Sequence, residues 1–178
     1  ALGAPALADI DNDGLPEIFV SSQASGPGPN EGGRLTVFES DGTVKKDTEI
    51  LDRSGFTTPT VFDFQNDGKF ELIHVDEENV RVLDALALTE LYKTRHTSRT
   101  VYEYPVIADI DGDKQADIVL TGTDDDFVAG VTPGIRVFKA RNGAFADAGS
   151  VWGSHAFHID DVAEDSTIPL LEPPSWLT

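Results

Sequence analysis

The chain has 178 residues, enough for one sizeable core or one array of repeats, and 39% of them are hydrophobic. Acidic residues outnumber basic ones by 32 to 13, and the resulting formal charge of −19 argues against nucleic acid or anionic lipid as a partner. No apolar run approaches the roughly 20 residues that span a bilayer, so membrane insertion is not expected either. Because so many like charges repel one another in a compact state, the composition calls for bound cations.

Cysteine and methionine are both absent. Without Cys, the chain has no disulfide, no thiolate zinc site and no Cys nucleophile. No signal-peptide pattern precedes Ala1, and there is no initiating Met. We therefore expect a mature or internal piece of a longer precursor.

Three segments of the chain align with one another, at residues 5–20, 59–75 and 105–120. Each begins with a Pro four residues before an Asp, continues through a nine-residue acidic loop and ends in a short apolar run. We call the loops loop 1 (residues 9–17), loop 2 (residues 63–71) and loop 3 (residues 109–117).

A second block recurs after each loop. Short runs of β-branched and aromatic residues predict strands at residues 34–38, 80–83 and 135–138. The pairs Asp41-Gly42 and Asn142-Gly143 favour hairpin turns. A fourth strand is predicted in each unit, near residues 43–46, 89–93 and 144–146.

The units recur at 54 and then 46 residues, about the length of one propeller blade. The predicted fold is all-β, with β-propeller-like blades of four-stranded antiparallel sheets and a calcium-binding loop between the first and second strands. The predicted units are residues 1–54, 55–100 and 101–150, followed by a tail at 151–178 that packs on the repeats or on a neighbouring subunit. An ordinary β-sandwich with coincidental acidic loops is the alternative.

The loops have the layout that a calcium ion requires. Ca²⁺ takes about six to eight oxygen ligands, and a short loop supplies them from alternate carboxylates, one backbone carbonyl and a final acid. The predicted ligands of loop 1 are Asp9, Asp11, Asp13, the carbonyl of Leu15, and Glu17. Those of loop 3 are Asp109, Asp111, Asp113, the carbonyl of Gln115, and Asp117.

Loop 2 is predicted to be the weaker site, because Gln65 replaces one acid. Its other ligands are Asp63, Asp67, the carbonyl of Lys69, and Glu71. Mg²⁺ is the rival ion, but it prefers a tighter octahedron with several retained waters. A solvated acidic turn is the alternative for any single loop.

Two details concern how the loops fold. Gly14 supplies the turn in loop 1, whereas Lys114 fills that place in loop 3 and Gly moves to position 112, so loop 3 is expected to turn slightly differently. The second loop position is apolar in every copy, and these side chains are expected to anchor the loops to the core: Ile10, Phe64 and Ile110.

The pattern D-x-D-x-D-G-x-x-D/E between two apolar strands resembles the FG-GAP or VCBS repeat, over residues 1 to about 150. This resemblance implies calcium-binding blades like those of integrin α-subunit propellers and of bacterial surface proteins, with structural calcium away from any ligand-binding face. It also implies an extracellular, secreted or cell-surface location. The Phe-Gly pair in the name of the repeat is absent, and no ligand site carries over.

Three units are fewer than the about four to eight blades of a closed propeller. Missing blades outside the chain, an open array, or completion by other subunits would each resolve this. We expect protein partners, through self-association or neighbouring domains of the same precursor, or a glycan.

The chain has four His residues, and His155 and His158 lie beside Asp160 and Asp161. This pair is a candidate transition-metal site, with a packing role as the alternative. No G-x-S-x-G elbow, phosphate loop or H-E-x-x-H pattern occurs, so no enzyme is predicted. The leading hypothesis is a calcium-stabilised extracellular structural or adhesion module, or a subunit of a surface filament or matrix. The alternatives are a lectin-like glycan-binding propeller and a non-catalytic part of a secreted polysaccharide-degrading enzyme.

Overall fold

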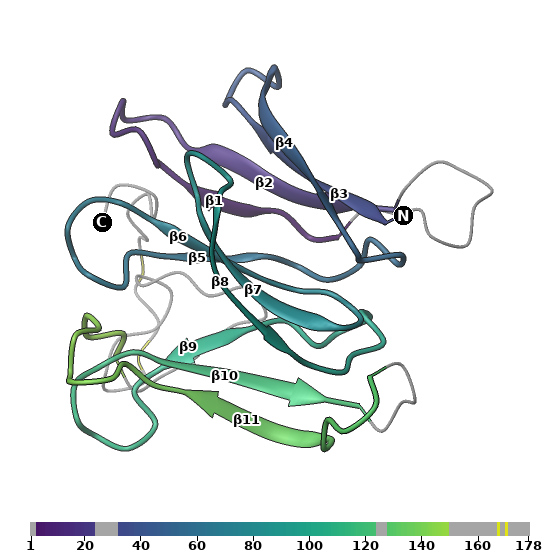
Figure 1. Ribbon diagram of the computed structural model, residues 1–178. Coiled ribbons are helices and arrows are strands. Elements are labelled where there is room, and N and C mark those ends of the chain that lie inside the picture. Colours follow the sequence, from purple (N-terminus) through teal and green to yellow (C-terminus); the bar gives the residue numbers. More distant parts are fainter. Residues whose placement is uncertain (1–2, 24–31, 124–127, 150–166, 168–169, 171–178) are drawn as a thin grey trace.

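The computed structural model describes residues 3–23, 32–123, 128–149, 167 and 170. Across these residues the regular structure is all β, and the strands form three antiparallel sheets of four, four and three strands (Figure 1). No helix in the described part of the chain is long and apolar enough to cross a membrane. The all-β expectation is therefore confirmed.

Each sheet is a meander, in which strands that follow one another along the chain are hydrogen-bonded neighbours. Sheet 1 contains β1 (Ala6–Ala8), β2 (Glu17–Ser22), β3 (Gly33–Phe38) and β4 (Val44–Ile50). Sheet 2 contains β5 (Thr60–Phe62), β6 (Glu71–Val75), β7 (Asn79–Asp84) and β8 (Glu90–Arg95). Sheet 3 contains β9 (Val106–Ala108), β10 (Asp117–Gly122) and β11 (Gly134–Phe138). The acidic loops connect the first strand of each sheet to the second, as predicted.

The sheets are stacked face to face, with sheet 2 between sheets 1 and 3 (Figure 1). Adjacent residues of β6 divide between two hydrophobic cores. Leu72 shares one core with Phe19 and Val37 of sheet 1, and Ile73 shares the other with Ile118 of sheet 3. Side chains alternate across a strand, so a strand buried on both faces needs an almost continuous apolar sequence, as β6 has.

This arrangement gives every sheet two distinct faces. The front face of sheet 1 is the face that packs on sheet 2, and we call the equivalent faces of sheets 2 and 3 their front faces. The opposite face of each sheet is its back face. The front face of sheet 1 packs on the back face of sheet 2, and the front face of sheet 2 packs on the back face of sheet 3. Two copies of the same interface therefore occur within the chain.

A β-bulge interrupts sheets 1 and 2 at the same place. Val37 pairs with Lys46 but Phe38 pairs with Val44, which leaves Lys45 as the extra residue of β4. In sheet 2 the matching shift leaves Leu91 as the extra residue of β8. A bulge re-aims the side chain of its extra residue, and this has a direct effect on loop 1.

The fourth strand predicted at residues 144–146 is wrong. The turn before it forms, with positive φ at Asn142 (81°) and Gly143 (67°), but the chain then crosses toward loops 2 and 3. Ala146 donates its N–H to the carbonyl of Phe64 (2.7 Å) and accepts the N–H of Ala116 (2.7 Å). The Phe145 ring lies 4.6 Å from that of Phe64, so burial of this aromatic side chain between the sheets prevails over strand pairing.

Two features remain predictions. They are the unit boundaries at residues 54, 100 and 150, and closure into a propeller. The predicted tail at residues 151–178, with His155 and His158, falls outside the described residues apart from two isolated positions.

Candidate metal centre

The three acidic loops fold through the same set of hydrogen bonds. In loop 1, the Asp9 carboxylate accepts the backbone N–H groups of Asp13 (3.1 Å) and Gly14 (2.8 Å). The equivalent bonds join Asp63 to Asp67 and Gly68 in loop 2, and Asp109 to Asp113 and Lys114 in loop 3. The first carboxylate thus closes each turn, which is why an Asp occupies that position every time.

Each loop also places its fourth and sixth residues in the left-handed region. In loop 1 these are Asn12 (φ 61°) and Gly14 (φ 88°), and loop 2 repeats the Asn-Gly pair. Loop 3 adopts the same pattern with Gly112 (φ 80°) and Lys114 (φ 63°). Loop 3 therefore keeps the backbone conformations of the other loops. Its turn differs slightly, as expected, because the Asp109 carboxylate also accepts the N–H groups of Asp111 (3.3 Å) and Gly112 (2.7 Å).

The last acid of each loop folds back over the second residue. The Glu17 carboxylate accepts the N–H of Ile10 at 2.9 Å, and the matching pairs in the other loops are Glu71 with Phe64 and Asp117 with Ile110. Glu17 is almost fully buried, and burial raises its pKa although the hydrogen bonds it accepts act in the opposite direction. A buried carboxylate with a raised pKa is one that a cation would stabilise.

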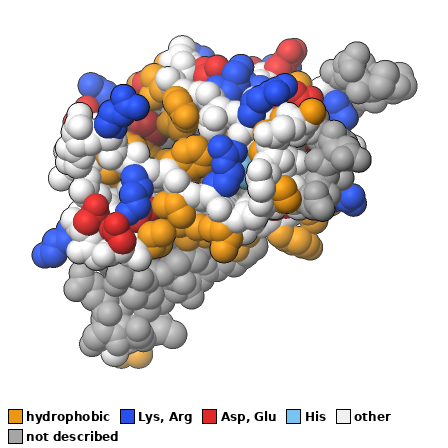
Figure 2. All heavy atoms as spheres, turned by 60° about the horizontal axis from the view of Figure 1, so that its bottom comes forward, with side chains coloured by type: hydrophobic (Ala, Val, Ile, Leu, Met, Phe, Trp, Pro, Cys, Tyr) orange, Lys and Arg blue, Asp and Glu red, His pale blue; other side chains and the backbone are white. Residues whose placement is uncertain are grey.

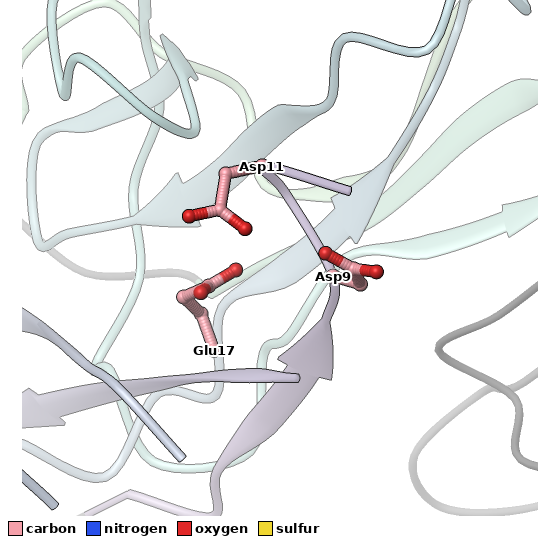
Figure 3. A group of neighbouring side chains, drawn as sticks. All are labelled: Asp9, Asp11 and Glu17. Atoms are coloured by element: carbon pink, nitrogen blue, oxygen red, sulfur yellow. The ribbon is translucent and has the colours of Figure 1, made fainter. Parts of the chain in front are cut away.

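Three carboxylates converge in loop 1 and three in loop 3. Asp9, Asp11 and Glu17 each offer an oxygen within 4.8 Å of the others, and their carboxylates point toward a common centre (Figure 3). Asp109, Asp111 and Asp117 do the same in loop 3. Burial acts to raise the pKa of Asp109. The hydrogen bonds that its carboxylate accepts from backbone N–H groups outweigh this effect and lower the pKa. Hard oxygen donors of this kind suit Ca²⁺.

Other predicted ligands lie outside these clusters. Asp13 and Asp113 accept the N–H groups of Leu15 (2.8 Å) and Gln115 (3.0 Å) instead. In loop 2, the described acidic residues form no such group of three. The NH₂ group of Gln65 faces Glu71 and donates to both carboxylate oxygens, at 2.8 and 3.0 Å.

An ammonium group already lies among the carboxylates of loop 1. Lys45, the extra residue of the β4 bulge, donates to Asp11 (2.7 Å), Glu17 (3.1 Å) and Glu39 (3.2 Å). Burial would lower the pKa of Lys45, but these three carboxylates outweigh it and raise the pKa. The hydrogen bond from Lys45 also lowers the pKa of Asp11. Loop 1 is therefore arranged to hold a positive charge.

Loop 3 has the same feature from a different strand. Lys139, directly after β11, donates to Asp111 and forms an ion pair with Asp117 (3.4 Å). In the aligned units, the position of Lys139 is occupied by Glu39 and Asp84, and that of Lys45 by Leu91 in sheet 2. The motif analysis missed both lysines. Alignment shows a charged residue after each third strand, but not that its side chain reaches the loop.

The second loop position is an anchor in only two of the three loops. Ile10 and Phe64 are buried in the cores in front of sheets 1 and 2. Ile110 is 53% exposed, so the prediction that it anchors loop 3 is wrong. Sheet 3 is the last of the stack, and no described sheet lies in front of it.

The two described histidines lie at the other ends of the sheets. His74 is fully buried, and neither ring nitrogen has a hydrogen-bond partner. The Nε2 atom of His96 lies 3.1 Å from the carbonyl oxygen of Thr121. Neither belongs to the groups of potential metal ligands found among the described residues.

Part of the chain matches a known repeat. Residues 9–74, which include loops 1 and 2, match the family model of the FG-GAP-like repeat. The resemblance drawn from the acidic loops is confirmed for that segment. No curated protein matches the chain.

A solved structure shares the fold. The chain is similar to the crystal structure of the V. cholerae biofilm matrix protein Bap1, with a TM-score of 0.71 and 22% sequence identity. The similarity covers 92% of this chain and 32% of that protein, so this chain spans about a third of its length.

Proposed function

We propose that the acidic loops bind Ca²⁺ and that the chain is a non-catalytic, calcium-stabilised module of an extracellular structural or adhesion protein. The observation that carries this proposal is the convergence of three carboxylates in loop 1 and in loop 3, two of which contact an ammonium group in each loop. A calcium ion would supply more charge than the ammonium and accept more oxygen ligands.

The proposed ligands extend beyond the two clusters. In loop 1 they are Asp9, Asp11, Asp13, Glu17 and the Leu15 carbonyl, and loop 3 would use its equivalent residues. Loop 2 would bind more weakly through Asp63, Gln65, Asp67, Glu71 and the Lys69 carbonyl. When bound, calcium would join both ends of each loop and neutralise part of the charge of −19.

Extracellular use is inferred from the relatives. The FG-GAP-like match and the fold shared with a biofilm matrix protein support a module whose partners are proteins, as neighbouring domains or further copies. Closure into a propeller, alone or with additional blades, belongs to this proposal.

Thermal unfolding with and without calcium tests the proposal. A site saturated at 100 times its Kd adds about 2.7 kcal/mol, which for this size corresponds to about 5–10 °C in Tm. We expect such a rise with Ca²⁺, a smaller one with equal Mg²⁺, and reversal by chelator. The double variant Asp9→Asn/Asp109→Asn should lose most of the rise, whereas Asp41→Asn, in an exposed turn, should keep it. A Tm that ignores both calcium and chelator would contradict the proposal.

Glycan binding is a second candidate, because one surface hollow is aromatic. Phe56, Tyr102 and Tyr104 line a cavity of about 150 Å³ beside Thr58. Exposed aromatic rings offer apolar faces to sugar rings, with hydroxyl groups close by for hydrogen bonds. A glycan array read with the parent chain and with Tyr102→Ala tests this candidate, and equal binding by both proteins would contradict it.

A further inference from the structure

The front face of sheet 3 has the composition of a core surface but is not covered like one. In sheet 1, the front-face residues Phe19, Leu35 and Val37 are each at most 1% exposed, because sheet 2 packs on them. The residues at the same register positions in sheet 3 are Val119, Ile135 and Val137. Ile135 is 75% exposed and Val137 is 39% exposed.

These residues form a continuous apolar surface. Val106, Val119 and Val137 lie directly opposite one another across β9, β10 and β11, and Ile135 lies two residues along β11 on the same face. Exposed Ile110 occupies the position at which Ile10 and Phe64 are buried in the other units. Figure 2, in which the β11 side of the molecule comes forward, shows hydrophobic side chains gathered in the middle of that view, with Lys and Arg nearby. Exposed apolar patches of this kind mark interaction sites.

The opposite end of the stack carries the complementary surface. On the back face of sheet 1, Leu7, Ile18, Phe38 and Val44 form one row across all four strands. Leu7 is 47% exposed and Val44 is 60% exposed. In sheet 2 the equivalent row contains Leu72 and Leu83, and both are buried against sheet 1.

The two ends therefore present the two halves of an interface that the chain already makes twice. We propose that the front face of sheet 3 in one copy packs on the back face of sheet 1 in a second copy, head to tail. Such an interface joins different surfaces, so it extends into a row of copies or closes into a ring. Among the described strands, none pairs with the outer edge of β11, which leaves that edge available to another strand.

Charge controls this association. Each copy carries a formal charge of −19, so copies repel one another at low ionic strength, and salt or bound calcium weakens the repulsion. We therefore expect association to strengthen with salt and with calcium, in contrast to an interface held by ion pairs.

Light scattering of the full 178-residue chain in calcium and moderate salt tests the proposal. Two variants each block one surface: Ile135→Asp/Val137→Asp at the front of sheet 3, and Leu7→Asp/Val44→Asp at the back of sheet 1. The parent should exceed the 19.2 kDa mass of one chain as concentration rises, and each variant alone should remain at that mass. An equimolar mixture of the two variants should form dimers and nothing larger, because each retains one intact surface.

The control variant Leu91→Asp changes an exposed apolar residue of β8 in sheet 2, which is not an end sheet of the stack, and should associate like the parent. Melting curves check that every variant folds. A parent chain that stays monomeric throughout would overturn the proposal and leave these faces to other polypeptide segments. A mixture that stays monomeric, or a blocked variant that still associates, would also overturn it.

Discussion

The ammonium nitrogen of Lys45 lies 3.1 Å from Oε1 of Glu17, although 28 positions separate the two residues along the chain. The β4 bulge aims this lysine into loop 1, where it contacts the same carboxylates that are proposed to bind calcium. Calcium and Lys45 therefore compete for these oxygens, so the lysine stabilises the loop in the absence of metal and weakens the binding of metal.

Replacing Lys45 with Leu, the residue at the equivalent bulge of sheet 2, should raise the calcium affinity of loop 1 by about tenfold or more, since no ammonium has to be displaced. The same variant should melt earlier than the parent in chelator, because three carboxylates lose their counter-charge. Calorimetric calcium titration and melting curves measure both effects. Lys46→Leu removes the same charge one residue further along β4 and should leave both the calcium affinity and the melting temperature in chelator unchanged. Equal affinities for Lys45→Leu and the parent would rule out competition.

The strength of the sites should follow their carboxylate content. Asp109→Ala is expected to reduce the calcium-dependent rise in Tm more than Asp63→Ala, because loop 3 gathers three carboxylates and loop 2 has Gln65 in place of one. Tm with and without calcium is the readout for both variants. The reverse order would mean that the contacts of Lys139 with Asp111 and Asp117 in loop 3 outweigh the number of acids.

The strained backbone of loop 3 offers a stabilising substitution. Lys114 has a φ of 63°, in a position that loops 1 and 2 give to Gly. Lys114→Gly should raise the free energy of unfolding by about 0.5–1 kcal/mol, as relief of left-handed strain exceeds the entropy cost of Gly. Urea denaturation measures this difference. The opposite change at the matching position, Gly14→Ala, should destabilise the chain, and a loss of stability in Lys114→Gly would show that the Lys side chain makes a compensating contact.

Buried His74 should make stability depend on pH. Burial lowers the pKa of His74 below its ordinary value of 6.5, although the nearby carboxylates of Asp52 and Asp76 act to raise it. Arg81 also faces the ring and acts to lower the pKa. Below about pH 6.5 the unfolded chain therefore binds a proton that the folded chain does not bind. The contribution of His74 to the free energy of unfolding is highest above about pH 6.5 and decreases as the pH falls below that value.

The variant His74→Leu should therefore lose less stability than the parent between pH 7 and pH 5. At pH 7 it should be at least as stable, because two unpartnered ring nitrogens in a buried site cost about 1–3 kcal/mol. Urea denaturation of both proteins in chelator, in the same buffers, cancels the contribution of the loop carboxylates. Parallel stability curves over this pH range would contradict the assignment to His74.

The strands and the acidic loops were predictable because each depends on neighbours in sequence. Alternating or continuous apolar residues mark strands such as β6, and Asp9 closes its own loop by binding N–H groups four and five residues away. The Asn142-Gly143 turn forms for the same local reason.

The errors arise where residues far apart in sequence decide the structure. Ile110 has the same sequence context as Ile10, and it is exposed only because no described sheet covers it. Phe145 leaves the expected strand to pack on Phe64 of another unit. Lys45 reaches loop 1 through a one-residue bulge, which no pattern of residue types in β4 reveals.

The crossing of the chain after β11 determines how the stack responds to tension. Ala146 is hydrogen-bonded to both Phe64 and Ala116, and the carbonyl of Gly149 accepts the N–H of Asp109 (2.7 Å). A pulling force on the chain beyond Gly149 reaches these backbone bonds before it reaches the strands of sheet 3. Loops 2 and 3 therefore carry the load first, and they set the resistance of this end to mechanical unfolding. A more rigid loop would raise the force needed to unfold this end.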